Sequence, residues 1–361
     1  MKILVIHASA GAGHQKAAEA IYQGLQKTGQ HQVFLADALD YTPPLFKKMY
    51  QGTYSFMITK VPFIWKFVFN TLDRNSLQKF IRKARRIYNG INTKGLQWYL
   101  RDEKFDCIIS THFMSVEVVS ALKEQGLIRS KLICVVTDFD VHKIWLAKNV
   151  DKYAVACDWT KDKVKQLGVE DSKIFSTGIP TNDKFSEPHD ISGLKSKLGL
   201  TQNDFTVLIA TGSFGIGPIE EIIEALKDIQ TIVVCGHNKG LYERLSKKRL
   251  PLTKVLGLVN NMHELMAISN VMVTKPGGLS IAEALVSQLP MIFFNAIPGQ
   301  EENNIKVLKI HGIGLSNCSI KEIVQKINEF KTSKDQFLTA LKNTQTLARP
   351  FAGRDIINLI Q

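Results

Sequence analysis

The stretch "VMVTKPGGLSIAEAL", residues 271–285, joins an apolar run to a helical pattern through a glycine turn. Its first four residues are apolar or β-branched without polar alternation, which is typical of a strand buried in a parallel sheet. Pro276, Gly277 and Gly278 form the turn, and helical spacing begins at Ser280. Main-chain N–H groups at such a helix start bind anions, helped by the helix dipole. The stretch therefore predicts an α/β domain with an anion site after this strand.

The remainder of the chain repeats this alternation of strand and helix. Apolar runs predict strands at 2–6, 33–36, 106–110, 132–137, 152–156, 174–177, 206–210, 231–235, 254–258, 271–274 and 291–294. Helical patterns lie between them, for example at 15–27, 115–125, 219–227, 280–288 and 301–310. Such an alternation favours parallel sheets covered on both faces. The chain is therefore predicted to form two doubly wound, Rossmann-like α/β domains that face a cleft.

A polar segment rich in Pro and Gly separates the two series of strands. It has the sequence "GIPTNDKFSEPHDISGLKSKLG" and spans 178–199. Such segments are typical of domain boundaries, and a length of 361 residues suits two domains. We therefore expect a first domain at 1–178 and a second at 179–344. A C-terminal helix at about 345–361 is expected to pack back onto the first domain.

The positive charge of the chain is concentrated in one segment. The formal net charge is +13, and between 47 and 104 there are 13 Lys and Arg against three acidic residues, a net of +10. A local basic patch indicates an anionic partner. The five cysteines include no CxxC pair, which favours reduced, buried thiols in the cytoplasm. No apolar run is long enough for a signal peptide or a membrane span.

Two further features predict that the turn at 276–278 belongs to a nucleotide-sugar site. Glu283 lies one helical turn in, where its carboxylate can accept two hydrogen bonds from a ribose diol, although a solvated helix residue is the alternative. Gln300 and Glu301 in "PGQEENN" offer amide and carboxylate groups to a hexose. The candidate donor-binding residues are Gly212, Ser213, Phe214, Val259, Met262, Pro276, Gly277, Gly278, Leu279, Ser280, Glu283, Gln300 and Glu301.

Another glycine turn follows the first predicted strand, in "HASAGAGHQKAAEAI", residues 7–21. It lacks the third glycine of a dinucleotide fingerprint and the Gly-Lys-Ser/Thr of a P-loop. By its residues alone it is either a tight strand-to-helix connection or a ligand-binding turn that carries His14.

Taken together, these motifs resemble glycosyltransferase family 28, and within it the diacylglycerol glycosyltransferases, such as monogalactosyldiacylglycerol synthases and processive diacylglycerol β-glucosyltransferases. The matching strings are "SAGAGHQKAAEAI", "VVTDFDVHKIWL", "TGIPTNDKF", "NNMHELMAISNVMVTKPGGLSIAEAL" and "PGQEENN". They span almost the whole chain in the order of the family.

The resemblance implies a GT-B fold in which the C-terminal domain holds a UDP-sugar and the N-terminal domain holds the lipid acceptor. It also implies inversion at the anomeric carbon and no essential metal or other cofactor. His14 is then expected near the acceptor hydroxyl and the donor diphosphate, as the general base. Asp138 is the rival base, or a residue that orients the acceptor. Gly13, His142 and Trp145 are the candidate acceptor residues.

The basic segment also contains aromatic and aliphatic residues, in "FMITKVPFIWKFVF" (56–69) and "KFIRKARR" (79–86). This mixture suits insertion beneath lipid headgroups better than stacking on nucleic acid. The alternative is a buried helix with a solvated basic face. The candidate membrane residues are Phe63, Trp65, Lys66, Phe67, Lys79, Arg82, Lys83, Arg85 and Arg86.

We therefore expect an enzyme that transfers glucose or galactose from UDP to diacylglycerol, on the inner face of the cell membrane and without nucleic-acid partners. Transfer of N-acetylglucosamine to a polyprenyl-linked precursor is one alternative. A UDP-N-acetylglucosamine 2-epimerase is another, but it leaves the basic, aromatic segment unexplained. A non-catalytic lipid-binding module is a third, and the intact set of Pro-Gly-Gly turn, Glu283 and Gln300 argues against it.

Overall fold

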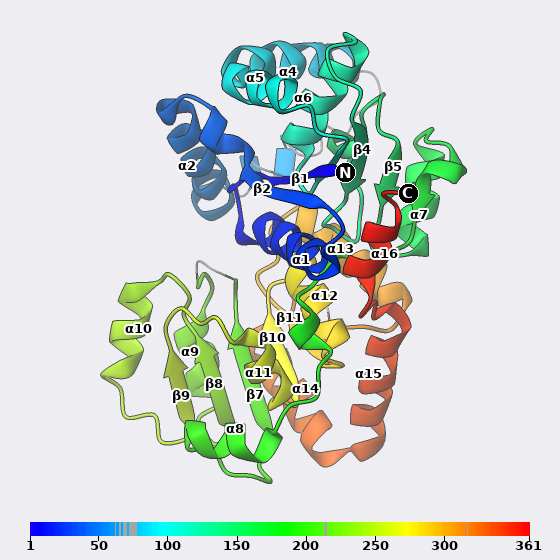
Figure 1. The fold of residues 1–361 in the computed structure, drawn as a ribbon. Coiled ribbons are helices and arrows are strands. Elements are labelled where there is room, and N and C mark those ends of the chain that lie inside the picture. Colours follow the sequence, from blue (N-terminus) through cyan, green and yellow to red (C-terminus); the bar gives the residue numbers. More distant parts are fainter. Residues whose placement is uncertain (62, 65, 68–70, 72–77, 213–214, 316) are drawn as a thin grey trace. The chain divides into compact units, whose positions relative to one another are not determined.

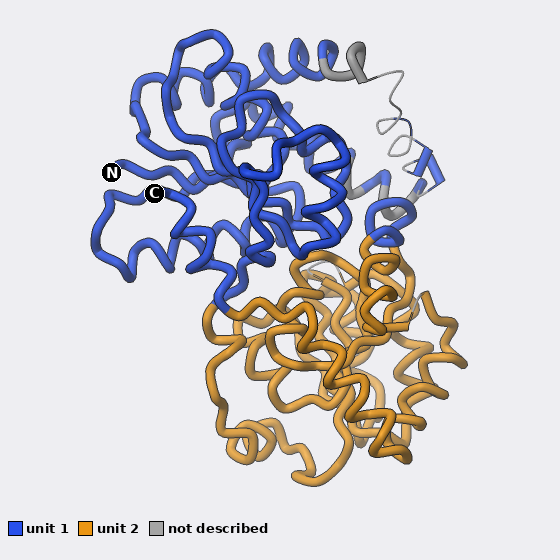
Figure 2. Tube along the Cα trace, turned by 90° about the vertical axis from the view of Figure 1, so that its right-hand side faces the viewer, with its two compact units in different colours: residues 1–182, 297–303, 351–361 blue, residues 183–296, 304–350 orange. Residues whose placement is uncertain are grey.

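The structure is a computed structural model that describes residues 1–361 except 62, 65, 68–70, 72–77, 213–214 and 316. The chain forms two compact units (Figure 2). Unit 1 comprises Met1–Asn182, Ile297–Asn303 and Phe351–Gln361, and unit 2 comprises Asp183–Ala296 and Asn304–Pro350. The first boundary between the units lies between Asn182 and Asp183, inside the polar segment 178–199. The short return to unit 1 at 297–303 has no counterpart in the sequence-based division.

Unit 1 is built on a six-stranded parallel sheet with the strand order β2-β1-β3-β4-β5-β6. Figure 1 labels β1, β2, β4 and β5 among these strands. Its strands are β1 (Lys2–His7), β2 (Gln32–Asp37), β3 (Cys107–Ser110), β4 (Lys131–Val135), β5 (Lys152–Ala154) and β6 (Ile174–Phe175). Its helices and 3-10 turns include α1 (Ala12–Thr28), η1 (Ala38–Tyr41), α2 (Pro44–Lys60), α4 (Gln78–Asn92), α5 (Lys94–Glu103), α6 (Phe113–Glu124), η3 (Lys143–Trp145), α7 (Asp158–Gln166), η4 (Asp171–Lys173) and α16 (Ala352–Asn358).

Both faces of the unit 1 sheet are buried. Along β1, Leu4 and Ile6 belong to one core cluster, whereas Ile3 and Val5 belong to a second one on the other face. The second cluster also contains residues of α1 and α16, so the last helix packs against the sheet with α1. This two-sided burial explains why the strands are apolar without alternation.

Unit 2 contains a five-stranded parallel sheet with the order β11-β10-β7-β8-β9. Its strands are β7 (Thr206–Ala210), β8 (Gln230–Val234), β9 (Thr253–Leu256), β10 (Val271–Thr274) and β11 (Met291–Phe293). Its helical elements are η5 (Asp183–Phe185), α8 (Ile191–Leu198), α9 (Ile219–Ala225), α10 (Lys239–Ser246), α11 (Met262–Ala267), α12 (Gly278–Val286), α14 (Ile320–Thr332) and α15 (Lys334–Leu347). The helix α13 (Gln300–Ile310) begins in unit 1 and continues in unit 2.

The structure confirms each strand predicted from the sequence, with ends that differ by at most two residues. Of the C-terminal helix predicted at about 345–361, the part that forms α16 lies in unit 1, whereas α15 ends at Leu347 in unit 2. Among the described residues, no helix has the length and hydropathy needed to span a membrane.

Each sheet has one point where successive connections leave in opposite directions. In unit 1 this switch point lies between β1 and β3, and in unit 2 it lies between β7 and β10. In open parallel sheets, ligands bind outside the carboxyl ends of the strands at such points. The two switch points therefore locate the candidate binding regions of the two units.

Candidate functional site

His14 lies at the switch point of the unit 1 sheet. The strand β1 ends at His7, and α1 begins at Ala12 after the glycine turn. Gly11 caps α1 with extended backbone angles and no side-chain hydrogen bond. In the first turn of α1, His14 Nδ1 lies 2.8 Å from the carbonyl oxygen of Thr111, which directly follows β3. This contact fixes the imidazole across the ends of two neighbouring strands.

The contact with Thr111 determines the tautomer of His14. A carbonyl oxygen can only accept a hydrogen bond, so Nδ1 must carry a proton and donate it. The hydroxyl oxygen of Thr137 lies 3.0 Å from the same Nδ1 atom. Burial lowers the pKa of His14 to about 4, although the bond to Thr111 acts in the opposite direction. The imidazole is therefore neutral near pH 7, and its Nε2 atom carries a lone pair.

Two more imidazoles lie in this region. His112 is buried, and its ring meets that of His14 edge-on, with 4.7 Å between the ring centroids. Its Nδ1 atom accepts a hydrogen bond from the N–H of Met114 and so caps α6. Burial lowers the pKa of His112 well below its usual value, and it also lowers the pKa of His7. All three rings are therefore neutral near pH 7.

The predicted acceptor residues His142 and Trp145 are both buried. Trp145 is part of the main core cluster of unit 1, and its ring centroid lies 5.9 Å from that of His14. His142 Nδ1 accepts a hydrogen bond from the N–H of Ile144 and caps η3. The Trp145 ring lies beside His14, and contact of either side chain with an acceptor stays a prediction. Gly13 precedes His14 in the first turn of α1.

Asp138 follows Thr137 at the same edge of the sheet, just beyond the end of β4. The side-chain amide of Gln300 donates to both of its carboxylate oxygens, over 3.2 and 3.3 Å. Glu301 is engaged locally, because its carboxylate accepts a hydrogen bond from the N–H of Ile297 over 2.6 Å. Unit 1 thus brings together a predicted base and a predicted sugar-binding residue.

The predicted phosphate turn lies at the switch point of the unit 2 sheet. Thr274 at the end of β10 pairs with Ala210 at the end of β7, so the turn at 276–278 and Gly212 follow neighbouring strand ends. Gly212 has a φ of 75°, a conformation that glycine adopts without strain. Thr211 beside it is buried, and its hydroxyl has no hydrogen-bond partner among the described residues.

The helix α12 begins at Gly278, two residues before the start at Ser280 that the sequence predicts. Gly277 caps the helix with extended backbone angles, and no side chain at the cap position accepts a hydrogen bond from the first N–H groups. The buried Asn304 holds the turn, because its side-chain amide donates to the carbonyl oxygen of Pro276 over 3.1 Å. Glu283 is half-buried on the second turn of α12. Gly278 is buried, and Leu279 and Ser280 are half-buried.

The remaining predicted donor residues lie at the end of β9 or outside the described part of the chain. Val259 follows β9, and Met262 begins α11; both are half-buried. Because β9 is parallel to the other strands, these residues share the carboxyl edge with the turn at 276–278. Ser213 and Phe214 lie outside the described residues.

Comparison with known proteins identifies the family. The family model for monogalactosyldiacylglycerol (MGDG) synthase matches residues 14–181, and the model for the glycosyltransferase family 28 C-terminal domain matches residues 206–352. The processive diacylglycerol β-glucosyltransferase of Bacillus subtilis is 31% identical over 96% of this chain and 91% of its own. Its counterpart from Bacillus cereus strain AH187 is 28% identical over 99% of this chain and 93% of its own.

The chain belongs to the diacylglycerol glycosyltransferases of family 28. Solved structures agree on the fold. The Staphylococcus aureus MnaA–UDP structure has a TM-score of 0.64 at 14% identity and covers 99% of this chain and 95% of its own. The structure of Acinetobacter baumannii MurG has a TM-score of 0.59 at 15% identity, and it covers 100% of this chain and 99% of its own. At such identities these neighbours show the GT-B fold alone.

Several basic residues that the sequence assigns to a membrane surface of this glycosyltransferase are held by carboxylates. Arg85 contacts Glu117 over 2.5 Å, Arg86 pairs with Glu124, and Lys66 lies 3.0 Å from Glu302. Lys83 is exposed, as are Phe63 and Phe67 at 83% and 66%. Trp65 and the side chains of Lys79 and Arg82 lie outside what the structure describes.

Sequence reasoning missed Thr111 and His112 as neighbours of the predicted base. Both follow directly after β3, in the string Ser-Thr-His at 110–112. Polar residues at a strand end are the same signal that identified Asp138 after β4. That signal was present at β3, but only the pairing of β1 with β3 shows that these residues meet His14.

Proposed function

We propose that this family 28 glycosyltransferase transfers a hexose, glucose or galactose, from a UDP-sugar to the free hydroxyl of diacylglycerol at a membrane surface. The names of the curated relatives support the lipid acceptor and the glucosyl donor. Within the structure, the observation that carries the proposal is the contact of His14 Nδ1 with the carbonyl oxygen of Thr111 over 2.8 Å. This contact holds the proton on Nδ1, so Nε2 is the atom that accepts a proton.

The proposed reaction is a direct displacement with inversion. The acceptor O–H transfers its proton to His14 Nε2 while the oxygen attacks the anomeric carbon of the sugar. The bond from that carbon to the diphosphate oxygen breaks, and its electron pair leaves with UDP. Asp138, held by Gln300, orients the acceptor hydroxyl in this scheme.

We propose that the start of α12 stabilises the departing diphosphate without a metal ion. The positive end of a helix dipole and its first N–H groups favour an anion at this position. Asn304 fixes the turn that precedes the helix. Glu283 binds the ribose hydroxyls, and Val259 and Met262 lie beside the uracil ring of the nucleotide. Full activity after treatment with a strong chelator is expected, and loss of activity that Mg²⁺ or Mn²⁺ restores would contradict this part of the proposal.

We further propose that the outer face of α4 and α5 contacts the membrane. Arg85 and Asn89 on the inner face of α4 both contact Glu117 of α6. Ile87 and Ile91 are offset from them by two residues, which places them on the opposite face of the helix. They are 55% and 61% exposed.

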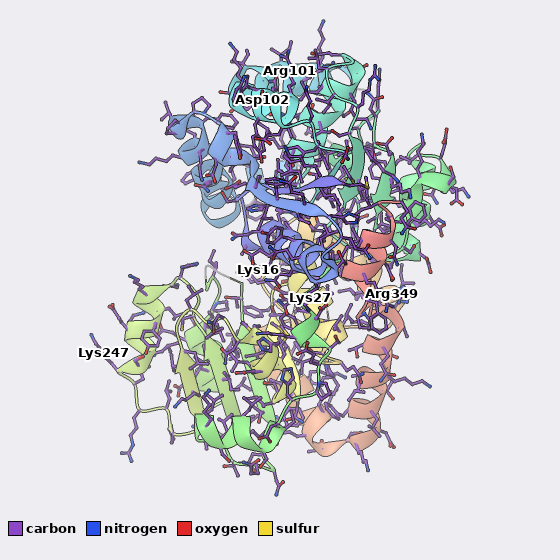
Figure 3. All side chains as sticks on the ribbon, in the orientation of Figure 1. Lys16, Lys27, Arg101, Asp102, Lys247 and Arg349 are labelled. Carbon is purple, nitrogen blue, oxygen red and sulfur yellow. The ribbon has the colours of Figure 1, made fainter. Side chains whose placement is uncertain are left out.

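On α5, Trp98 is offset by two residues from the buried Leu96 and Leu100, which places it on the opposite face of that helix, and it is 67% exposed. Lys83 lies four residues before Ile87 on α4, Lys94 lies four residues before Trp98 on α5, and both lysines are exposed. Arg101 and Asp102 lie near the end of α5 (Figure 3). Exposed apolar side chains flanked by lysines fit an anionic lipid surface, where each cation adds about 1 kcal/mol of binding free energy. This outer face, rather than Arg85 and Arg86, is the basic surface that we assign to lipid.

The deciding experiment incubates the protein with vesicles that contain either diacylglycerol or a polyprenyl phosphate acceptor. Each mixture receives one donor: UDP-glucose, UDP-galactose or UDP-N-acetylglucosamine. We expect one of the first two donors to yield a hexosyl-diacylglycerol whose anomeric proton coupling in NMR shows the β-linkage. The control is His14→Gln, which keeps a polar side chain. Conversion of UDP-N-acetylglucosamine to its 2-epimer, or transfer only to a polyprenyl phosphate acceptor, would overturn the proposal.

A further inference from the structure

The environment of His14 contains two threonines whose roles go beyond packing. The hydroxyl of Thr111 donates to the main-chain oxygen of His14 over 2.8 Å, while its own carbonyl accepts from the imidazole. Thr111 is fully buried and Thr137 is 5% exposed. Thr111 therefore holds both the backbone and the side chain of His14, and Thr137 approaches Nδ1 from the end of the neighbouring strand β4.

Because Nδ1 carries its proton toward Thr111, the Thr137 oxygen must act as a second acceptor for that N–H. A lone acceptor restricts rotation of an imidazole about its Cβ–Cγ bond less than two acceptors do, and here the two acceptors follow different strands, β3 and β4. We propose that Thr111 and Thr137 are positioning residues that fix His14 in the Nδ1–H tautomer and stabilise its protonated form during the reaction. The inference rests on the proposed function, in which His14 is the base.

The proton balance explains why such a pair is needed. When Nε2 takes the proton of the acceptor hydroxyl, the ring becomes an imidazolium with one N–H on each nitrogen. No carboxylate among the described residues contacts His14, and the neighbouring rings of His112 and Trp145 offer no negative charge. The two oxygens at Nδ1 are therefore the groups that stabilise this charge, until the proton passes to solvent after sugar transfer.

The test uses Thr137→Val, which keeps the side-chain shape and removes the oxygen, and Thr137→Ser, which restores it. Thr344→Val is the matched control, since Thr344 is a buried threonine of α15 whose hydroxyl donates to a main-chain carbonyl elsewhere. NMR of ¹⁵N-histidine-labelled full-length protein reports the tautomer and pKa of His14, whose signals are identified by their loss in His14→Gln.

In the unsubstituted protein we expect the proton of His14 on Nδ1 and a pKa well below 6.5. Thr137→Val is expected to lower that pKa further and to reduce kcat roughly 10-fold at unchanged affinity for UDP, because one acceptor of the charged form is lost. Thr137→Ser should recover most of both changes, and Thr344→Val should show neither.

A proton on Nε2, or Thr137→Val with the same His14 pKa and kcat as the unsubstituted protein, would overturn the inference. The NMR measurement requires no substrate, so it tests the positioning even if no UDP-sugar is transferred. Loss of transfer with every donor, together with the expected tautomer, would instead contradict only the proposed function.

Discussion

The side-chain amide of Gln300 donates to both carboxylate oxygens of Asp138, although 162 positions separate these residues in the chain. The contact places a predicted sugar-binding residue against the rival candidate for the base. We expect Gln300→Ala to raise the KM for UDP-sugar roughly 2- to 12-fold, the range for one neutral hydrogen bond. Calorimetry with UDP is the control, since UDP lacks the hexose and should bind both proteins equally. Weakened binding of UDP itself would show that Gln300 contacts the nucleotide instead.

The second prediction separates the two candidate bases. His14→Ala is expected to lower kcat by about two to four decades, as for loss of a general base. Asp138→Asn keeps the shape of the side chain and should cost less, because its role in our scheme is to orient the acceptor. If Asp138→Asn is the more damaging of the two in steady-state assays, the base has been assigned to the wrong residue.

The pH profile follows from the same environment. Burial lowers the pKa of His14 to about 4, so the base is neutral and active above that pH and becomes protonated below it. We therefore expect the acid limb of kcat/KM, which reports the free enzyme, to lie well below pH 6.5. If kcat/KM for the UDP-sugar instead falls with an apparent pKa near 6.5, His14 is solvated in the free enzyme.

Glu283 provides a test of the ribose assignment. Loss of charged hydrogen bonds in Glu283→Ala is expected to weaken UDP binding by about 1.5–3 kcal/mol. The matched control is 2′-deoxy-UDP, which lacks one of the two hydroxyls that Glu283 is proposed to bind. It should bind the unsubstituted protein more weakly than UDP does, and the substitution should affect it less. Equal losses for both ligands in calorimetry would exclude a direct ribose contact.

The membrane surface on α4 and α5 predicts two distinct defects in vesicle sedimentation. Ile91→Ser with Trp98→Ser should weaken binding to neutral and anionic vesicles alike, because apolar burial does not depend on lipid charge. Lys83→Gln with Lys94→Gln should remove the preference for anionic vesicles and its salt dependence.

Matched controls come from unit 2. Leu338 is 48% exposed on α15, and Lys247 is an exposed lysine at the end of α10 (Figure 3). Leu338→Ser and Lys247→Gln should sediment like the unsubstituted protein. If either pair of substitutions on α4 and α5 behaves like these controls, that part of the outer face is ordinary solvated surface.

The sequence alone determined the layered architecture of this protein. Eleven apolar runs became the eleven strands named above because burial on both faces of a parallel sheet requires continuous apolar residues, a local property of each run. The Pro-Gly-Gly turn at 276–278 was equally local, since a strand, a turn and a helix start occupy one short stretch of chain.

Tertiary structure decided which residues meet. Thr111 contacts His14 because β1 pairs with β3. Gln300 contacts Asp138 where the chain returns to unit 1 at 297–303. Arg85 binds Glu117 of α6, whereas Lys83 is exposed to solvent. In the sequence both residues count equally as positive charges. Each of these contacts depends on strand order and helix orientation. These are set by the packing of the whole unit, whereas the sequence pattern of a single element specifies only that element and the face it buries.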